Sequence, residues 1–300
     1  HMPVFAIRIK VYHIWIRILF IALHIRTSGA NVKVREKSIG CRTYFANRPE
    51  KLNALDLEMF EAIAKQASDL KQDTSVRAVI ISGNGRAFCT GLDLKSMSGS
   101  PMKNVDRLLE RPSGYSNDED GIGNLAQDVG YLWRKLPIPV ICAMHGMCFG
   151  GGLQIALGAD FRFSTPDCKI SIMETKWGLI PDMAASITLR ELIRADVAKE
   201  LTMTGRVLDG KEAEALGLVT RCVADPLQEA ERVAKEIILK SPDAVAKAKQ
   251  LYQSTWVAPE ADCLEQETFM QRQLLLSWNQ IAASGRNFGI YLPYFQRKDN

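Results

Sequence analysis

The stretch HGMCFGGGLQ, residues 145–154, follows the apolar segment Val140–Met144 and runs into a second one, Leu153–Leu157. The first segment predicts a buried strand and the second a helix. Glycines at such a junction leave backbone N–H groups free at the positive end of the helix dipole. Taken alone, a glycine triplet indicates only close packing of a strand on a helix. The stretch matches neither the Gly-x-Gly-x-x-Gly fingerprint nor a phosphate loop.

A second glycine-centred turn, GRAFCTGLDL at residues 85–94, follows another apolar run, Ala78–Ser82. If the two turns converge, they direct two backbone N–H donors at one oxygen. That arrangement is an oxyanion hole, which stabilises a carbonyl oxygen as it becomes an enolate.

Strand-like and helix-like segments alternate around these turns. Val32–Val34 and Arg42–Ala46 predict a hairpin, and residues 55–70 carry a helical apolar stripe after the candidate N-cap Asp56. Residues 95–120 are rich in Gly, Pro, Ser and Asp and predict a loop. Beyond residue 182 the predicted helices are Ser186–Ala195, Val197–Met203, Pro226–Leu239, Pro242–Ser254 and Glu260–Ala283. The pattern therefore predicts an α/β front half with a helical tail.

Composition excludes several classes of protein. With 300 residues, 47% apolar and 24% charged, the chain can bury a large core, and a net charge of +4 does not favour nucleic-acid binding. Only His145 lies outside the N-terminal stretch, so a histidine-rich metal site is not expected, and a Ser-His-Asp triad would need that residue. The seven cysteines are scattered and include no Cys-x-x-Cys pair. We therefore expect them to pack as small buried hydrophobic residues, in a protein from a reducing compartment.

The first 35 residues contain basic but no acidic side chains, and charged and histidine residues interrupt their apolar run at positions 11–25. The run is too broken for a spanning helix, which needs about 20 apolar residues. Three interpretations fit: an organellar transit segment, an additional edge segment in which Ile7, Ile9 and Val11 alternate with basic residues, or an incorrectly assigned gene start. The expected location, mitochondrial or cytoplasmic, depends on this segment.

Four motifs occur together and in order: NRPEKLNAL at residues 47–55, AFCTGLDL at 87–94, the glycine triplet at 150–152 and GLIP at 178–181. Together they resemble the enoyl-CoA hydratase/isomerase family, the crotonase superfamily, over roughly residues 31–295. The resemblance implies a spiral of strand-strand-helix turns over residues 31–225, after an extension at 1–30. It also implies a C-terminal helical trimerisation region at 226–300, and a homotrimer or a hexamer.

The same resemblance implies a coenzyme A thioester as substrate and no separate cofactor, metal or nucleic acid. It assigns the oxyanion donors to the backbone N–H groups of Leu92 and Gly151. Lys51 and Lys95 are basic candidates for the coenzyme A phosphates, although exposed lysines are commonly just solvated. The residues assigned to the thioester and pantetheine path are Ala87, Cys89, Gly91, Asp93, Leu94 and Gly150.

Family hydratases use two glutamates, and this chain keeps only the second of them, as Glu174. Gln154 occupies the first position, where an amide cannot act as a general base but can hold a water or hydroxyl group. Asp182 lies where dienoyl-CoA isomerases of the family place an aspartate, although those enzymes also keep an acid at the position of Gln154. A single glutamate resembles the arrangement of Δ3,Δ2-enoyl-CoA isomerases.

These residues support three hypotheses. The leading one is an enoyl- or dienoyl-CoA isomerase that uses Glu174 with help from Asp182. The second is a hydratase in which Gln154 holds the water, and the third is a catalytically silent acyl-CoA-binding protein.

Each candidate residue also has a structural interpretation. Glu174 could be a surface acid, and Asp182 could be the N-cap of a helix over Ala184–Arg190. The alternative for His145, Cys89 and Cys148 is a packing role. The aromatic tail forms either a core or a cover over a neighbouring subunit's site; its residues are Trp256, Phe269, Trp278, Phe288, Tyr291, Tyr294 and Phe295.

Overall fold

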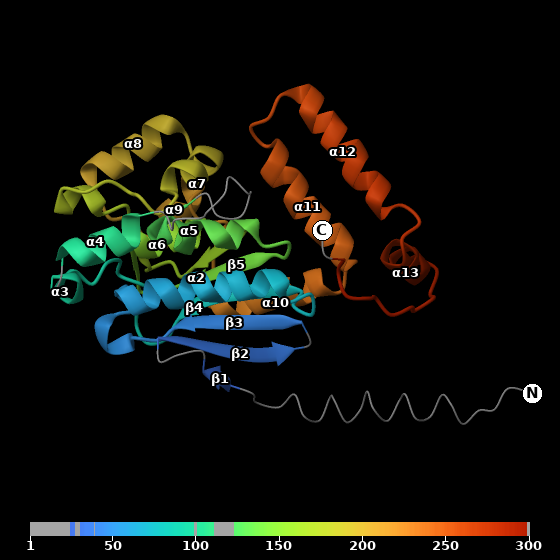
Figure 1. The fold of residues 1–300 in the computed structure, drawn as a ribbon, viewed down its shortest axis with the longest axis horizontal. Helices are drawn as coiled ribbons and strands as arrows, with labels where there is room; N and C mark the ends of the chain where they lie inside the picture. Colours follow the sequence, from blue (N-terminus) through green and yellow to red (C-terminus); the bar gives the residue numbers. More distant parts are fainter. Residues whose placement is uncertain (1–24, 28–30, 39, 99–100, 111–122, 299–300) are drawn as a thin grey trace, which may run out of the picture.

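A seven-stranded sheet organises the chain (Figure 1). The computed structural model describes residues 25–27, 31–38, 40–98, 101–110 and 123–298. In spatial order the strands are β1 (Ile25–Thr27), β2 (Val32–Ser38), β3 (Cys41–Ala46), β4 (Ala78–Gly83), β5 (Val140–Met144), β7 (Phe161–Ser164) and β9 (Arg221–Cys222). The first three strands pair antiparallel, which confirms the predicted hairpin, and all later neighbours pair parallel.

A second, two-stranded parallel sheet joins β6 (Met147–Phe149) to β8 (Lys169–Ser171). It continues the chain from the end of β5, so the glycine triplet starts α6 (Gly151–Leu157) directly beside it. The parallel pairing brings the start of α6 next to the segment that follows β8. This pairing positions the candidate site.

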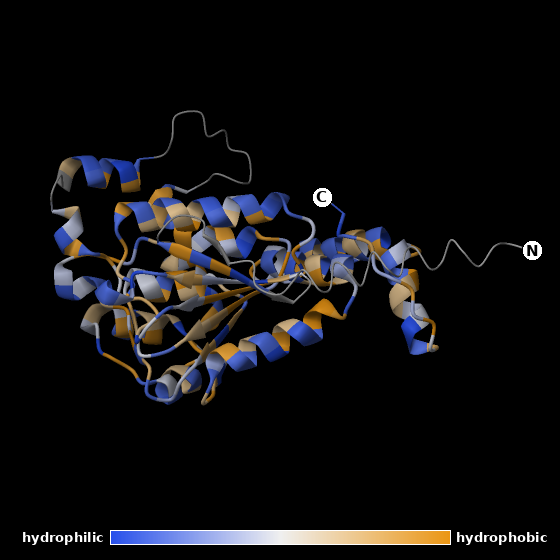
Figure 2. Ribbon diagram, turned by 90° about the horizontal axis from the view of Figure 1, so that it is seen from below, coloured by the Kyte–Doolittle hydropathy of each residue, from blue (hydrophilic) through white to orange (hydrophobic). Residues whose placement is uncertain are grey.

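Alternate residues of the central strands point to opposite faces of the sheet, as the period of a strand requires. One face, with Val79, Ile81 and Cys142, joins the main core. That core also takes in the apolar faces of α2 (Leu57–Gln72) and α5 (Leu125–Lys135). The other face carries Ile80 and Ile141 and is covered by α10 (Pro226–Ile238). Figure 2 shows alternating polar and apolar residues along the helices that flank the sheet.

The remaining helices form a layer beside α6 and an arm to one side of the core (Figure 1). The layer comprises α7 (Ala185–Leu192), α8 (Ala195–Thr204) and α9 (Gly210–Ala215). The arm comprises α11 (Pro242–Thr255), α12 (Glu260–Leu274) and α13 (Trp278–Asn287). Within the described ranges, no helix combines the length and apolar character that a membrane span needs.

Two predictions about the elements are wrong. The single helix predicted over Glu260–Ala283 is broken, because Leu276 adopts a left-handed φ of 61° and Ser277 caps α13 by accepting from Gln280 N. The predicted loop at 95–120 contains helices α3 (Leu94–Met97) and α4 (Pro101–Leu109). The rest of that loop, residues 111–120, lies outside the described residues.

Two further predictions concern the ends of the chain. Residues 1–24, which include the alternating pattern at Ile7–Val11, lie outside the described residues. Strand β1 belongs to the predicted extension at residues 1–30, and it pairs with β2 at the edge of the sheet. The aromatic tail does not form a core within this chain, since most of its side chains are more than half exposed: Trp256, Phe269, Phe288, Tyr291 and Phe295.

Candidate active site

The start of α6 provides the first backbone donor of the site. Gly150 precedes the helix with a left-handed φ of 51°, and a Cβ at this position would lie 3.4 Å from Glu174 Oε1. Gly151 is the first residue of the helix, so its N–H has no acceptor within the helix. Glycine at position 150 therefore permits the positive φ of the turn, and the Cβ distance shows that Glu174 lies directly beside it.

The turn at Gly91 provides the second donor. Gly91 has φ 86°, and bonds from Leu55 N to Gly91 O and from Asp93 N to Leu55 O hold the turn in place. These bonds leave the N–H of Leu92 with no acceptor among the described residues. A Cβ built on Gly91 would lie 3.5 Å from Gly151 N, so the two turns converge, which is the condition that an oxyanion hole requires.

The motif at residues 47–55 supports the second turn. Arg48 pairs with Asp93 at 3.1 Å and Asp56 at 3.0 Å, and the Asn53 amide donates to Ala87 O at 2.8 Å. Burial opposes ionisation of Asp93, but hydrogen bonds from Ser96 N and Arg48 outweigh it and lower the pKa of this carboxyl. Sequence reasoning did not single out Arg48 or Asn53, although both belong to the quoted motif.

A cavity of about 190 Å³ opens in front of the two turns. Its walls are mostly apolar, and Glu174 and Asp182 are the only ionisable side chains among its described lining residues. The exposed apolar residues Trp177, Leu179 and Ile180 belong to the lining. The predicted residues that line the cavity are Gly91, Leu92, Leu94, Gly150, Gly151, Glu174 and Asp182.

Glu174 begins the 3₁₀ turn η2 (Glu174–Trp177), shortly after β8. Its Oε1 accepts a hydrogen bond from Gln154 Nε2 at 2.6 Å, whereas the buried Oε2 has no partner in the described part of the chain. Burial raises the pKa of the Glu174 carboxyl above its ordinary value, and the charge of Asp182 raises it further. Glu174 is therefore not a surface acid but a partly buried carboxyl in the wall of the cavity, a type of group that can transfer protons.

Asp182 lies on the wall of the same cavity, and burial raises the pKa of its carboxyl. It does not cap the following helix, because the N-cap of α7 is Ala184, with φ 72° and no side-chain bond. The capping interpretation of Asp182 is thus wrong, and the site contains two carboxyl groups that resist ionisation.

Gln154 lies behind Glu174. Its side chain is only 2% exposed, does not line the cavity, and accepts a hydrogen bond from Met183 N at 2.7 Å. The sequence suggested that Gln154 contacts the substrate by holding a water or hydroxyl group; in the structure its amide bonds to Glu174 and to the backbone of Met183, beside Asp182.

Five other candidate residues lie off the cavity surface. Ala87, Cys89 and Asp93 are buried in its supporting wall, and burial raises the pKa of the Cys89 thiol to about 12. This thiol therefore packs as a small apolar group. Lys51 and Lys95 are exposed. A coenzyme A contact at these five positions stays a prediction.

His145 and Cys148 have structural contacts. The Nε2 atom of His145 lies 3.0 Å from Gly85 O and ties the two turns together, and Cys148 is fully buried beside Cys89. Among the described residues, no three His, Cys, Asp or Glu side chains gather in a metal-binding arrangement.

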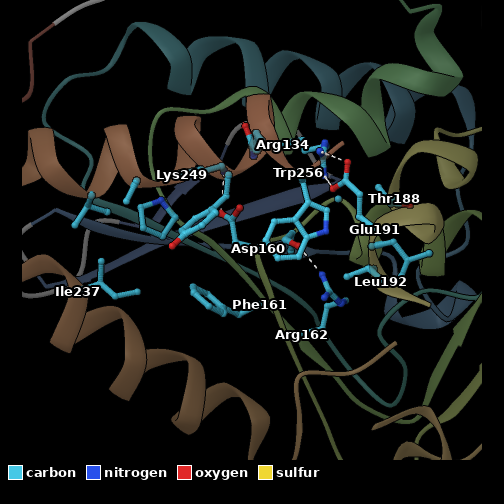
Figure 3. Close-up of a pocket in the computed structure, with 18 of the residues that line it drawn as sticks. Arg134, Asp160, Phe161, Arg162, Thr188, Glu191, Leu192, Ile237, Lys249 and Trp256 are labelled. Carbon is cyan, nitrogen blue, oxygen red and sulfur yellow. Dashed lines mark hydrogen bonds and ion pairs between the residues drawn. The ribbon is translucent and has the colours of Figure 1, made fainter. Parts of the chain in front are cut away.

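A larger cavity of about 510 Å³ lies between α11 and residues of α5, β7 and α7 (Figure 3). Arg134 pairs with Glu191 at 2.7 Å and Lys249 with Asp160 at 2.8 Å, and Arg162 donates to the carbonyls of Ala159 and Leu218. These charges already have partners within the fold, whereas Glu174 Oε2 has none among the described residues, so the cavity at Glu174 remains the candidate active site.

Known proteins resemble this chain in both sequence and fold. The sequence profile of the enoyl-CoA hydratase/isomerase family matches residues 41–281. The chain belongs to this family. Over 88% of its length it also superimposes with a TM-score of 0.75 on 98% of an enoyl-CoA hydratase from Mycobacterium smegmatis, at 25% identity. The predicted crotonase-like α/β fold with C-terminal helices is thereby confirmed.

Relatives within the family differ in their reactions. Human methylglutaconyl-CoA hydratase is 32% identical over 72% of this chain and 62% of its own length. Mouse Δ(3,5)-Δ(2,4)-dienoyl-CoA isomerase is 33% identical over 68% of this chain and 62% of its own length. The chain is thus an acyl-CoA enzyme of the hydratase/isomerase family, and overall identity does not distinguish the two reactions.

Proposed function

We propose that the protein is an isomerase that moves a carbon–carbon double bond in an enoyl- or dienoyl-CoA. The observation that carries this proposal is the Glu174 carboxyl in the wall of a cavity that Leu92 and Gly151 also line, with its Oε2 without a partner among the described residues. A single carboxylate can remove a proton from one carbon and return it to another, without a second base or a bound water.

The reaction needs only groups that the cavity contains. The two N–H groups hold the thioester oxygen and stabilise the negative charge that forms there. Glu174 removes a proton from C2, and the electrons delocalise onto the thioester oxygen. A proton then returns at C4 of a 3-enoyl chain, or at C6 of a 3,5-dienoyl chain, so the double bond moves with no change in composition. Asp182, the other acid in the cavity, assists the return step.

Hydration is the alternative activity, because the family contains hydratases. It requires a water held for attack at C3, and the hypothesis assigned that task to Gln154. The buried Gln154 amide instead bonds to Glu174 and Met183, which favours proton transfer over water addition. A catalytically silent protein is disfavoured because both acids line the cavity.

The activity is tested by mass spectrometry and NMR of the products after incubation of the protein with 2-enoyl-, 3-enoyl- and 3,5-dienoyl-CoA. We expect an unchanged mass and a displaced double bond from the last two substrates. A gain of one water from the 2-enoyl substrate would identify a hydratase, and thioester binding without any turnover would identify the silent protein.

Assembly is also a proposal. We propose a homotrimer or a dimer of trimers, because α12 and the tail expose apolar side chains in the described part of the chain. Examples are Leu264, Phe269 and Tyr291. Light scattering coupled to size-exclusion chromatography should give three or six times the chain mass of 33.4 kDa; a monomer at micromolar concentration would contradict this.

The raised pKa of Glu174 predicts a pH dependence. Because Glu174 must be ionised to accept a proton, kcat/KM should rise with pH through a midpoint above the ordinary value of 4.5. Asp182→Asn removes a negative charge that raises this pKa, so the midpoint should move to lower pH. The measurement is kcat/KM between about pH 4 and 9 for both proteins, and an unmoved midpoint would show that Asp182 does not act on Glu174.

A further inference from the structure

The side chain of Gln154 spans two parts of the active site. Its Nε2 lies 2.6 Å from Glu174 Oε1, and its Oε1 lies 2.7 Å from the backbone N of Met183, the residue after Asp182. We infer that Gln154 is a positioning residue, which holds the Glu174 carboxylate and the Asp182 segment in fixed places relative to the oxyanion hole. This inference rests on the proposed function, in which Glu174 transfers the proton.

The orientation of the amide follows from its neighbours. A backbone N–H can only donate, so the atom of Gln154 that faces Met183 must be the acceptor Oε1. The NH₂ group must then face Glu174. A flipped amide would place two donors together at Met183 and two acceptors together at Glu174, and the Gln154 side chain is too buried for water to relieve both contacts.

The fixed amide determines which oxygen of Glu174 can react. The Gln154 hydrogen bond occupies Oε1 and lowers the pKa of the carboxyl, in opposition to burial and Asp182. Oε2 is left without a partner among the described residues. Gln154 thus holds Glu174 in the form that accepts a proton, with one defined oxygen available.

A single helix connects this positioning contact to the oxyanion donor. Gly151 and Gln154 are three residues apart in α6, hence on one side of the helix, and all seven residues of α6 are buried. A Cβ on Gly152 would lie 2.6 Å from Cys89 O, so the helix also packs tightly on the segment from Cys89 to Leu92. The distance from the oxyanion hole to Glu174 is therefore set by one buried element.

The test replaces Gln154 with Met, which has a similar volume and makes neither hydrogen bond. We expect kcat for isomerisation to fall about 10- to 100-fold, the loss of one hydrogen bond to a charged group, with little change in KM. Without the Gln154 donor the pKa of Glu174 rises, so the acid limb of the pH profile should move to higher pH. Gln154→Glu keeps an acceptor for Met183 but places a second carboxyl beside Glu174, so it should move the limb in the same direction.

Gln127→Met is the matched control, because Gln127 accepts from Asn124 N in the capping box of α5 and does not contact Glu174. It should lower the melting temperature without moving the pH profile. If Gln154→Met behaves in the same way as this control, Gln154 is merely structural and the inference is wrong. A second check is non-additivity: in a Glu174→Gln background, Gln154→Met should change the residual rate less than about twofold, because its effect acts through Glu174.

A direct titration separates this inference from the proposed function. The pKa of Glu174 can be followed by NMR of protein labelled with ¹³C at the glutamate carboxyl, with Glu174→Gln used to assign the signal. A higher pKa in Gln154→Met supports the positioning role whichever thioester the enzyme converts. An equal pKa in the two proteins overturns it, even if isomerase activity is present.

Discussion

Glu174→Gln is expected to lower the turnover of 3-enoyl- or 3,5-dienoyl-CoA by about 10²- to 10⁴-fold, the usual contribution of a general acid–base group. Glutamine preserves the volume of the side chain, and its Oε1 can still accept from Gln154. Glutamine cannot, however, take a proton from C2. The thioester should still bind, because the N–H groups of Leu92 and Gly151 belong to the backbone and are not altered.

The measurement combines kcat with the dissociation constant of a saturated acyl-CoA of the same chain length. Glu265→Gln, an exposed residue of α12, is the control and should retain full activity. Loss of binding together with turnover would point to a disturbed cavity, and undiminished turnover by Glu174→Gln would remove Glu174 from the mechanism.

Lys249→Met is expected to destabilise the folded protein by about 3 kcal/mol, at the lower end of the effect of breaking a buried ion pair. The Lys249 side chain is 7% exposed, pairs with Asp160 at 2.8 Å, and donates to the carbonyls of Trp133 and Ile138. These contacts attach α11 to the core. Methionine retains the apolar stem but leaves Asp160 and both carbonyls without this partner.

Urea denaturation at a fixed protein concentration measures this effect. Lys235→Met, at an exposed position of α10, should change the free energy of unfolding by less than about 0.5 kcal/mol. A loss below about 1 kcal/mol for Lys249→Met would mean that the Lys249–Asp160 pair adds little to stability. Activity per folded molecule should be unchanged, since Lys249 lines the other cavity.

The two glycine turns could be predicted from the sequence because each follows directly on a buried strand. Parallel neighbours end at the same edge of a sheet, so turns after β4 and β5 must lie close together. Glu174 was singled out instead by the family resemblance, and the structure places it beside the second turn because it follows β8, which pairs with β6. The local sequence pattern was sufficient to predict the two glycine turns, because the pairing of their strands determines where the turns lie.

The role of Gln154 could not be predicted in this way. Its orientation depends on Met183, which is 29 residues further along the chain and reaches it only through tertiary packing. Similarly, the break after α12 requires a left-handed leucine at 276, and no glycine marks it. The break also positions α13 to contact the C-terminal tail: Asn279 Oδ1 accepts from Phe295 N, and Trp278 Nε1 donates to Pro293 O.

One measurement tests the central claim most directly. The protein is incubated with 3-enoyl-CoA and, separately, with 2-enoyl-CoA in water enriched in ¹⁸O, and the products are analysed by mass spectrometry and NMR. If Glu174 moves a proton within the substrate, the 3-enoyl chain becomes the 2-enoyl chain and no ¹⁸O enters either product. Incorporation of ¹⁸O at C3 of the 2-enoyl substrate, at a rate equal to or above that of double-bond migration, would contradict the account.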